Sequence, residues 1–449
     1  MEKLLLSEIA EFLKTECPAE KEITEISTDT RNLPEGCLFV AIRGERFDGH
    51  DFIPNAIEAG SAAAMSDHAV DGCPCIVVDD TRKAYLELSG YYRRKFSPIL
   101  VGVTGSVGKT TTKEMIALVL SEKYNCMKTQ GNFNNEIGLP RTLFGMDSTH
   151  EAAVIEMGMS DFGEISRLTK AAAPTIGVIT NIGFSHIENL KSQEGILKAK
   201  LEILDGMSEN APLIVNGDDA HLVPLRESLS RKVYLFGIDN ENCDYRAENI
   251  SETDGVTAFD ICYDGKSCHA EIPCVGRHNV LNALAAFCIG RLSSMTEIEI
   301  ISALKKYQPD AMRQNIVKKG DYTVIIDCYN ASPDSMKASL GVLSGMKSEG
   351  RKIAVLGDML ELGEASEKLH RLVGGYVKDA KPDMLFCYGK DSEYIVKDSN
   401  VPAAFSDDKA VLTNLIRDYM KPGDVLLFKA SRGMKLEEII DSLFNQEEK

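Results

Sequence analysis

The sequence predicts an α/β fold of three domains. Three observations carry this prediction: the chain length, two separate series of alternating strands and helices, and one glycine-bearing strand–loop–helix motif. With 449 residues, about three domains is the natural expectation. The composition, 44% apolar and 26% charged, is typical of a globular protein. We place the domain boundaries so that the three domains cover residues 1–97, 98–310 and 311–449.

The first domain is predicted to be a small α/β unit. Apolar runs at 37–42 and 75–78 indicate strands, and helical spacing is found at 52–64 and 85–96. The dipeptide Ser97-Pro98 then provides a plausible hinge, since proline disfavours continuation of a helix.

The second and third domains are predicted to contain mostly parallel sheets, because strand and helix patterns alternate in both. The expected strands of the second domain are 99–103, 153–157, 175–180, 213–216 and 233–237, followed by an antiparallel hairpin over 256–274 and helices at 279–290 and 296–306. A fresh series after Pro309 has strands at 322–327, 352–357, 384–389 and 425–429, which fits a doubly wound, Rossmann-like domain.

A phosphate-binding loop is predicted between the strand 99–103 and the helix that follows. The loop reads Thr104-Gly105-Ser106-Val107-Gly108-Lys109-Thr110-Thr111. Backbone N–H groups and a helix N-terminus form an anion site, Lys109 can reach terminal phosphates, and the Thr110 hydroxyl can bind Mg²⁺. Val103 stands where the generic motif has its first glycine, and a plain glycine-rich turn is the alternative. We interpret the loop as the ATP site of a central P-loop ATPase domain.

Charge and cysteine content exclude several classes of function. A net charge of −18 argues against broad nucleic-acid binding. No apolar stretch approaches the length of a membrane span, so no membrane insertion is expected, and the N-terminal segment mixes acidic and apolar residues unlike a signal peptide. The twelve cysteines include no C-x-x-C pair and no usual zinc spacing. We therefore expect a cytoplasmic protein with reduced thiols.

Polar residues at strand ends mark the expected ligand edge of the central sheet. Glu156 ends an apolar strand, where it is either a Mg²⁺ ligand or a solvent-facing acid. His186, just after the next strand, is either a metal ligand or a structural histidine. On spacing alone, Lys198 and Lys200 of the helical run 193–204 belong to a solvated face.

Several motifs resemble the Mur ligase family, whose members build the peptide stem of bacterial cell-wall precursors with ATP and Mg²⁺. The motifs are the loop 104–111, Gly-Asn-Phe-Asn-Asn-Glu-Ile-Gly-Leu-Pro at 131–140, Glu156-Met-Gly, Thr180-Asn-Ile with His186, Ala199-Lys-Leu-Glu-Ile and Gly-Arg-His-Asn-Val-Leu-Asn-Ala-Leu-Ala-Ala at 276–286. Stretches at 326–336, 356–363 and 428–432 resemble the member that joins D-alanyl-D-alanine to UDP-MurNAc-tripeptide. The resemblance implies an acyl-phosphate intermediate, the products ADP and phosphate, a UDP-sugar-binding first domain and a monomer.

The resemblance also implies roles for particular residues. Lys109, His186 and Lys200 would be catalytic, with Lys200 carbamylated; Thr110, Glu156, His186 and Lys200 would hold the metal. The nucleotide would be bound by the loop Thr104–Thr111, by Asn279 and Asn282 at adenine, by Arg313 at a phosphate and by Asp327 at the ribose. The other substrates would be bound by Ser27, Thr28, Arg43, Gly44 and Asp48, next to Gly49 and His50, and by Asn134 and Asn135. Ile326 and Ser332 depart from the family pattern, where an acid and an asparagine are usual.

Three rivals stay open at this point. The ligase that adds the preceding diamino acid usually carries an Asp-Asn-Pro-Arg-type stretch. The corresponding segment of this sequence, 358–363, reads Asp-Met-Leu-Glu-Leu-Gly. A folate polyglutamylating ligase shares the core motifs but has a different first domain. A P-loop switch protein would hydrolyse ATP without making a bond. The sequence does not distinguish L-lysine from meso-diaminopimelate at the third stem position.

Overall fold

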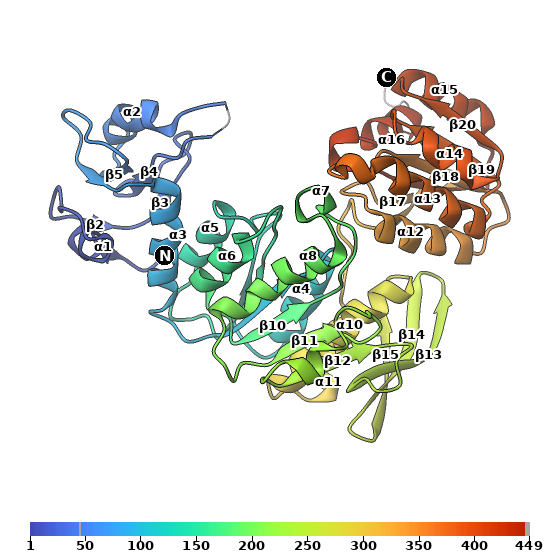
Figure 1. Cartoon of the computed structure of the whole chain (residues 1–449), viewed down its shortest axis with the longest axis horizontal. Helices are drawn as coiled ribbons and strands as arrows, with labels where there is room; N and C mark the ends of the chain where they lie inside the picture. The colour runs from blue at the N-terminus through green and yellow to red at the C-terminus, as the bar shows by residue number, and fades with distance from the viewer. Residues whose placement is uncertain (45, 445–449) are drawn as a thin grey trace.

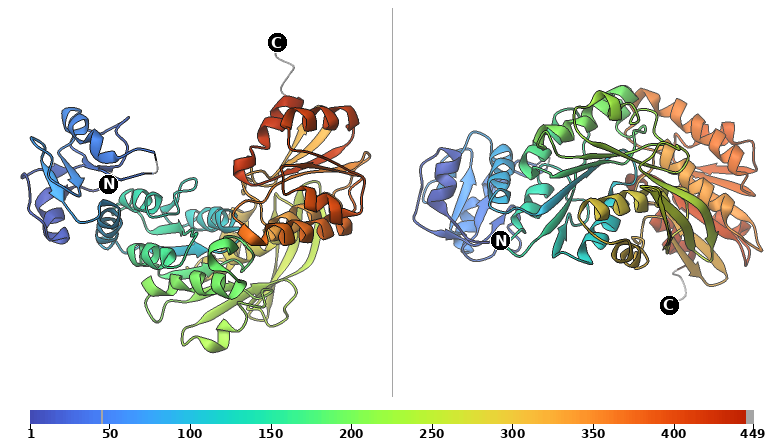
Figure 2. Two further views of the ribbon diagram at one scale, coloured as in Figure 1. Left: turned by 45° about the horizontal axis from the view of Figure 1, so that its top comes forward. Right: turned by 90° about the horizontal axis from the view of Figure 1, so that it is seen from below.

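The computed structural model describes residues 1–44 and 46–444 and has three α/β units, each built around a main sheet. The N-terminal and C-terminal units lie at opposite ends of the central one (Figures 1 and 2). The predicted α/β architecture is confirmed. None of the described helices combines the length and the apolar character that a membrane crossing requires.

The N-terminal unit contains a four-stranded parallel sheet in the order β3-β4-β5-β6 and a short two-stranded sheet, β1-β2. The strands are β1 (Leu4–Leu5), β2 (Glu22–Ile23), β3 (Ile26–Ser27), β4 (Leu38–Val40), β5 (Ala63–Ser66) and β6 (Cys75–Val77), and the helices are α1 (Leu6–Leu13), α2 (Ile53–Glu58) and α3 (Thr81–Arg93).

The helix predicted over 52–64 is wrong in its second half. Helix α2 ends at Glu58, and Gly60 then adopts a φ of 103°, a conformation that favours glycine. The following residues Ala63–Ser66 form the buried strand β5 between β4 and β6. A strand that is buried on both faces has no alternation of polar and apolar residues. The short, largely apolar run 63–66 is therefore indistinguishable by pattern from the last turn of a helix.

The central unit has a nine-stranded sheet in the order β15-β14-β13-β12-β11-β10-β7-β9-β8, parallel from β8 to β13. Its strands are β7 (Ile99–Thr104), β8 (Cys126–Lys128), β9 (Ala152–Glu156), β10 (Ile176–Ile179), β11 (Leu213–Asn216), β12 (Val233–Gly237), β13 (Tyr245–Thr253), β14 (Val256–Tyr263) and β15 (Lys266–Ile272). The predicted hairpin is β14–β15, to which β13 adds a third antiparallel strand.

Helices cover both faces of the central sheet. They are α4 (Lys109–Ser121), α5 (Gly138–Phe144), α6 (Glu164–Ala172), α7 (Ile187–Leu190), α8 (Gln193–Leu201), α9 (Leu225–Ser228), α10 (Arg277–Leu292) and α11 (Glu297–Leu304). Leu100 of β7 packs in the core that includes α5, α6 and α8, whereas Val101 and Val103 pack with α4, α10 and α11. Helix α3 joins the first of these cores through Tyr85 and Tyr92, which contact Phe144, and so attaches the N-terminal unit.

The C-terminal unit has a six-stranded sheet in the order β16-β17-β21-β18-β19-β20, with only the edge strand β16 antiparallel. Its strands are β16 (Asn315–Lys319), β17 (Tyr322–Ile326), β18 (Lys352–Gly357), β19 (Met384–Tyr388), β20 (Ala403–Ser406) and β21 (Val425–Lys429), and its helices are α12 (Pro333–Gly345), α13 (Ser366–Ala380), α14 (Glu393–Ser399), α15 (Lys409–Tyr419) and α16 (Glu437–Phe444). Strands β16 and β20 were not predicted.

Candidate active site

The glycine-bearing loop connects β7 to α4 and curls over its own lysine. Lys109 is the first residue of α4, and its Nζ donates to the carbonyl oxygens of Gly105 at 2.8 Å and Ser106 at 3.4 Å. Thr104, at the end of β7, is buried and donates to the carbonyl of Met157. The loop therefore presents a lysine and the N-terminus of a 13-residue helix at the carboxyl edge of the sheet, where anions bind.

The next strand end fixes this loop from one side. Val107 donates its N–H to Asn181 Oδ1 at 2.9 Å, and its carbonyl accepts from Asn181 Nδ2 and from Thr180 Oγ1 at 2.6 Å. Thr180 and Asn181 follow β10, the neighbour of β7 in the sheet. The loop is thus held open by side chains of the scaffold, a preorganisation that phosphate binding by backbone N–H groups requires.

Gly105 has a close backbone approach that only glycine allows. Its φ is 151°, and a Cβ built on it would lie 1.8 Å from Thr180 Oγ1. We expect Gly105→Ala to lower the free energy of unfolding by about 1–3 kcal/mol, because Thr180 cannot yield without releasing Val107. Urea titration of this variant beside Gly341→Ala, where a Cβ meets nothing within 4 Å, checks the prediction. Equal midpoints for the two variants would contradict it.

Glu156 supplies a buried carboxylate at the end of β9. The residue is 2% exposed, its Oε1 accepts from Asn134 Nδ2 at 2.8 Å, and its Oε2 has no hydrogen-bond partner. The nearest cation is Lys113, whose Nζ lies 3.8 Å from Oε2. A buried carboxylate oxygen without a donor is costly, and a cation ligand is the usual remedy. With the Thr110 hydroxyl lining the same cavity, this oxygen-rich donor set fits Mg²⁺.

His186 and Lys200 differ in their surroundings. His186 precedes α7, which lies beside the C-terminal unit (Figure 1), and its Nδ1 is 2.9 Å from Glu361 Oε2 of that unit. This hydrogen bond holds the pKa of Glu361 below its ordinary value. Lys200 of α8 is 2% exposed, and burial, reinforced by Lys109, pushes its pKa well below the ordinary value. No hydrogen bond or ion pair joins its Nζ to a described residue, so nothing offsets the effect of burial on the ammonium form.

One cavity of about 760 Å³ gathers most of the predicted residues at the junction of the central and C-terminal units. Those on its wall are Ser106, Val107, Gly108, Lys109, Thr110, Thr111, Asn134, Asn135, Glu156, His186, Asn279, Asn282, Arg313 and Asp327. Thr104, Gly105 and Lys200 are not on the wall. The carbonyl of Gly105 nevertheless accepts from Lys109, and the charge of Lys109 helps to lower the pKa of Lys200.

A chain of amide groups runs along the wall at the start of α10. Thr112 donates to Asn282 Oδ1, Asn282 Nδ2 donates to Asn279 Oδ1, and Asn279 Nδ2 donates to the carbonyl of Val275 and to Gln314 Oε1. Gln314 Oε1 is also 2.6 Å from His278 Nε2, while Gln314 Nε2 is buried without a partner. Because a carbonyl can only accept, Val275 fixes which end of the Asn279 amide is the NH₂ group. The partners of Asn279 are thereby oriented as well, which determines the polar atoms that face a ligand.

Gln314 and His278 were not among the predicted site residues. They lie 36 residues apart, and neither belongs to a periodic pattern, so no local signal connects them. His278 belongs to the motif 276–286, but the resemblance assigns it no role. Glu361, Ser339 and Lys429 were likewise missed, because each comes from a loop, helix or strand end that the C-terminal fold brings to the cavity.

Asp327 and Lys429 form a buried ion pair on the C-terminal side of the cavity. The Nζ–Oδ2 distance is 2.7 Å, and the side chains are 2% (Lys429) and 16% (Asp327) exposed. Burial raises the pKa of Asp327, but Lys429 and the Ser339 hydroxyl outweigh it, and the pKa lies below its ordinary value. Nearby, the Arg313 guanidinium stacks 3.8 Å from the centre of the Tyr329 ring.

We expect Lys429→Met to lower the free energy of unfolding by about 3–5 kcal/mol, because it leaves the Asp327 carboxylate buried and unpaired. Urea unfolding at neutral pH measures this. The matched control is Lys409→Met at the more exposed pair with Glu438, for which about 0–1 kcal/mol is expected. The wild-type contribution should fade as pH drops through the lowered pKa of Asp327, since the pair exists only while the carboxylate is ionised. Losses of equal size in the two variants would contradict this assignment.

The residues expected to hold a UDP-sugar lie apart from the cavity, in the N-terminal unit. Ser27 donates to the carbonyl of Asp29, Gly44 donates to the carbonyl of Phe47, and Arg43 Nε donates to Asp48 Oδ2 at 3.0 Å. Thr28 follows β3 at the same end of the small sheet as these loops. The five residues Ser27, Thr28, Arg43, Gly44 and Asp48 are absent from the cavity wall among the described residues.

Comparisons with known proteins agree with this arrangement of units. Residues 22–89 match the model described as "Mur ligase family, catalytic domain", residues 103–290 the "Mur ligase middle domain" and residues 312–432 the "Mur ligase, glutamate ligase domain". The chain is an α/β ligase of three units and belongs to the Mur ligase family.

Its relatives point to one member of that family. The chain is 41% identical to UDP-N-acetylmuramoyl-tripeptide–D-alanyl-D-alanine ligase of Bacillus subtilis and 36% identical to the Escherichia coli protein of that name, in each case over 99% of both chains. A crystal structure of MurF from Acinetobacter baumannii matches with a TM-score of 0.93 at 29% identity, covering 99% of this chain and 100% of that one. MurF ligase from Thermotoga maritima, solved in complex with ADP, matches with a TM-score of 0.86 at 30% identity over 94% and 97%.

Proposed function

We propose that the protein joins D-alanyl-D-alanine to the terminal carboxylate of UDP-MurNAc-tripeptide at the expense of ATP, giving the UDP-MurNAc-pentapeptide, ADP and phosphate. The observation that supports this proposal is that one cavity is lined by the phosphate-binding loop, Glu156 and the α10 amides. In addition, nearly the full length of the chain matches relatives that are named for that reaction. We further propose that the protein is a cytoplasmic monomer.

The chemistry explains why a ligase needs the phosphate-binding loop. A carboxylate is a poor electrophile, because its leaving group would be oxide. Attack of the carboxylate oxygen on the γ-phosphorus releases ADP and gives an acyl phosphate. The amine of D-alanyl-D-alanine then attacks the acyl carbon, the C–O bond to phosphate breaks, and the amine nitrogen loses a proton. The protein must position the reactants and stabilise the charge that develops on phosphoryl and acyl oxygens.

Lys109 and the loop are assigned to the phosphates. The N–H groups of the loop and of the first turn of α4 would bind phosphate oxygens, and the Lys109 ammonium would balance the charge of the transferred group. Among the described residues Lys109 has carbonyl partners and no ion-paired acid, so its charge is available to the nucleotide. Asn279 and Asn282 would contact adenine, Arg313 a phosphate and Asp327 the ribose.

The metal would be held by Thr110, Glu156, His186 and Lys200. When bound, Mg²⁺ supplies positive charge that stabilises the phosphoryl oxygens. Glu156 offers the unpartnered Oε2, and Asn134 fixes the rest of its carboxyl group. Lys200 would contribute as a carbamate: its amine, in the neutral form that burial favours, would add to CO₂ and lose a proton, giving an anionic ligand.

Domain closure would bring the substrates together. We propose that residues 1–97 bind the UDP-sugar through Ser27, Thr28, Arg43, Gly44 and Asp48, that residues 98–310 and 311–449 bind ATP, and that Asn134 and Asn135 face the substrate from the central unit. Because the two sets of residues lie in different units, the carboxylate must travel to the phosphate. Small-angle X-ray scattering should show a smaller radius of gyration with all ligands than without; superimposable profiles would refute closure.

The function is tested by ATP-dependent phosphate release from the purified protein. The assay is run with UDP-MurNAc-tripeptide in its L-lysine and meso-diaminopimelate forms, with and without D-alanyl-D-alanine. We expect release only when tripeptide and dipeptide are both present, and the faster form identifies the third stem residue. Release that ignores both acceptors would instead support an ATP-driven switch protein.

A further inference from the structure

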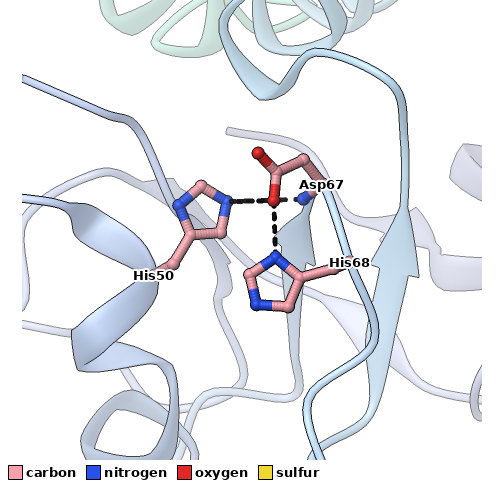
Figure 3. Close-up of side chains that lie close together, drawn as sticks. All are labelled: His50, Asp67 and His68. Carbon is pink, nitrogen blue, oxygen red and sulfur yellow. Dashed lines mark hydrogen bonds and ion pairs between the residues drawn. The ribbon is translucent and has the colours of Figure 1, made fainter.

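Two histidines and an aspartate of the N-terminal unit converge on one point, away from the cavity (Figure 3). His50 lies in the 3₁₀ turn Gly49–Phe52, and Asp67 and His68 directly follow β5. His50 Nε2 is 3.3 Å from Asp67 Oδ1, and His68 Nδ1 is 2.6 Å from the same oxygen. Each residue offers a ligand atom, and these atoms all lie within 4.8 Å of one another. No other group of three such residues exists within 1–44 and 46–444.

The protonation pattern of His50 leaves a lone pair at this point. Its Nδ1 is 2.6 Å from Asp48 Oδ1, a carboxylate that can only accept, so Nδ1 carries the proton. Nε2 is therefore an acceptor, and it takes the N–H of Asp67 at 3.3 Å. The same Nε2 faces the Asp67 Oδ1 atom, which also bears lone pairs. The Asp67 N–H at Nε2 and the His68 ring at Oδ1 partly offset the repulsion between these two acceptors, and a cation between them would use both lone pairs.

The surrounding charges direct the Oδ1 atoms toward that point. Arg43 donates to Asp48 Oδ2 through Nε and pairs with Asp67 Oδ2 through Nη2, both at 3.0 Å. The guanidinium thus occupies one oxygen of each carboxylate and leaves both Oδ1 atoms for the histidines. Two carboxylates and one guanidinium give the cluster a net negative charge, which favours a cation.

We infer that His50 Nε2, Asp67 Oδ1 and His68 form a site for a divalent transition-metal ion of the zinc type. Two imidazoles and a carboxylate suit this class, whereas Mg²⁺ prefers a set made of oxygens. The Asp48–His50 hydrogen bond is the carboxylate–histidine support that commonly orients a metal-binding imidazole. The His50 side chain is 6% exposed and that of His68 55% exposed, so a fourth position faces water. This site is distinct from the one proposed at Glu156. It adjoins Arg43 and Asp48, which are proposed to bind the UDP-sugar, but its test does not depend on the proposed function.

Co²⁺ is the probe that tests the inference, because its visible spectrum reports its ligands. The full chain is stripped with chelator, supplied with excess Mg²⁺ to fill oxygen-rich sites, and titrated with Co²⁺. We expect one saturable equivalent with weak visible bands and without the intense near-ultraviolet bands of thiolate ligation. His68→Ala and Asp67→Asn should abolish this equivalent, and Asp48→Asn should weaken it about 10- to 100-fold.

The matched control is His150→Ala, which removes another histidine paired with an aspartate, Asp147, where no third ligand converges. It should bind Co²⁺ like the wild type. Zn²⁺ should raise the melting temperature of the wild type and of His150→Ala, each relative to its own metal-free value, but not that of His68→Ala relative to its metal-free value. Equal Co²⁺ binding by wild type and His68→Ala, or binding with thiolate bands only, would overturn the inference and leave a proton between His50 and Asp67.

Discussion

Lys109→Met should lower kcat about 10²- to 10³-fold, the cost typical of removing one preorganised donor to a developing anion. The change removes the only charged group of the loop 104–111. Its partners, the carbonyls of Gly105 and Ser106, stay in place, and Ser106 still lines the cavity. Steady-state phosphate release with all substrates present measures the effect.

The control for this variant is Lys123→Met, which removes an exposed lysine two residues beyond the end of α4. Its Nζ donates to the carbonyl of Ser294, and neither residue lines the cavity. The activity of the variant should equal that of the wild type. A Lys109→Met protein that unfolds at the wild-type temperature and keeps more than about a tenth of the activity would contradict the assignment, since that loss is under 1.4 kcal/mol of barrier.

Lys200→Ala should lower kcat at least about 10²-fold, because an anionic ligand to the metal is worth several kcal/mol of transition-state stabilisation. If the ligand is a carbamate, a small carboxylate can occupy the space that the truncated side chain leaves. We therefore expect acetate or formate, added to the assay, to restore part of the activity of Lys200→Ala and to leave the wild type unchanged.

Lys198→Ala is the matched control, since Lys198 is on the same helix and exposed, with its ammonium over the Phe162 ring. It should be active and insensitive to acetate. Two results together would show that Lys200 acts as an amine and not as a carbamate. Lys200→Ala would be inactive with and without acetate, and the wild-type rate would not change when CO₂ and bicarbonate are removed.

The two lysines also show where prediction from sequence succeeds and where it stops. Spacing alone assigned both to a solvated helix face, but Lys200 points inward beside Ile196 and Ala199, which are fully buried. The apolar residues of helix α8 are spread around the helix and do not define one polar face. Only the resemblance to a family therefore distinguished Lys200 from Lys198. The local pattern around Lys109 was sufficient, because strand, loop and helix follow one another in the chain.

Long-range arrangements were beyond the reach of local patterns. The α/β architecture was predicted correctly, as were the strand that ends at Glu156 and the strand that directly precedes Asp327, because buried parallel strands appear as short apolar runs. The polar cluster of His278, Asn279 and Gln314 was not, because it joins the start of α10 to the connection that enters the C-terminal unit. Such contacts depend on how two units dock, and no periodicity within either unit encodes that docking.

The hydrogen bond between His186 and Glu361 has a thermodynamic consequence. When His186 donates its Nδ1–H to the Glu361 carboxylate, its Nε2 is the ring nitrogen that stays free to bind a metal. Because histidine and acid belong to different units, the basicity of a ligand in the central unit depends on where the C-terminal unit sits. If His186 binds the metal as proposed, linkage requires reciprocity: a C-terminal unit docked on α7 would raise the affinity for the metal, and the metal would stabilise that docking by the same free energy. Under that proposal, binding of the cation and assembly of the nucleotide pocket would be one cooperative transition.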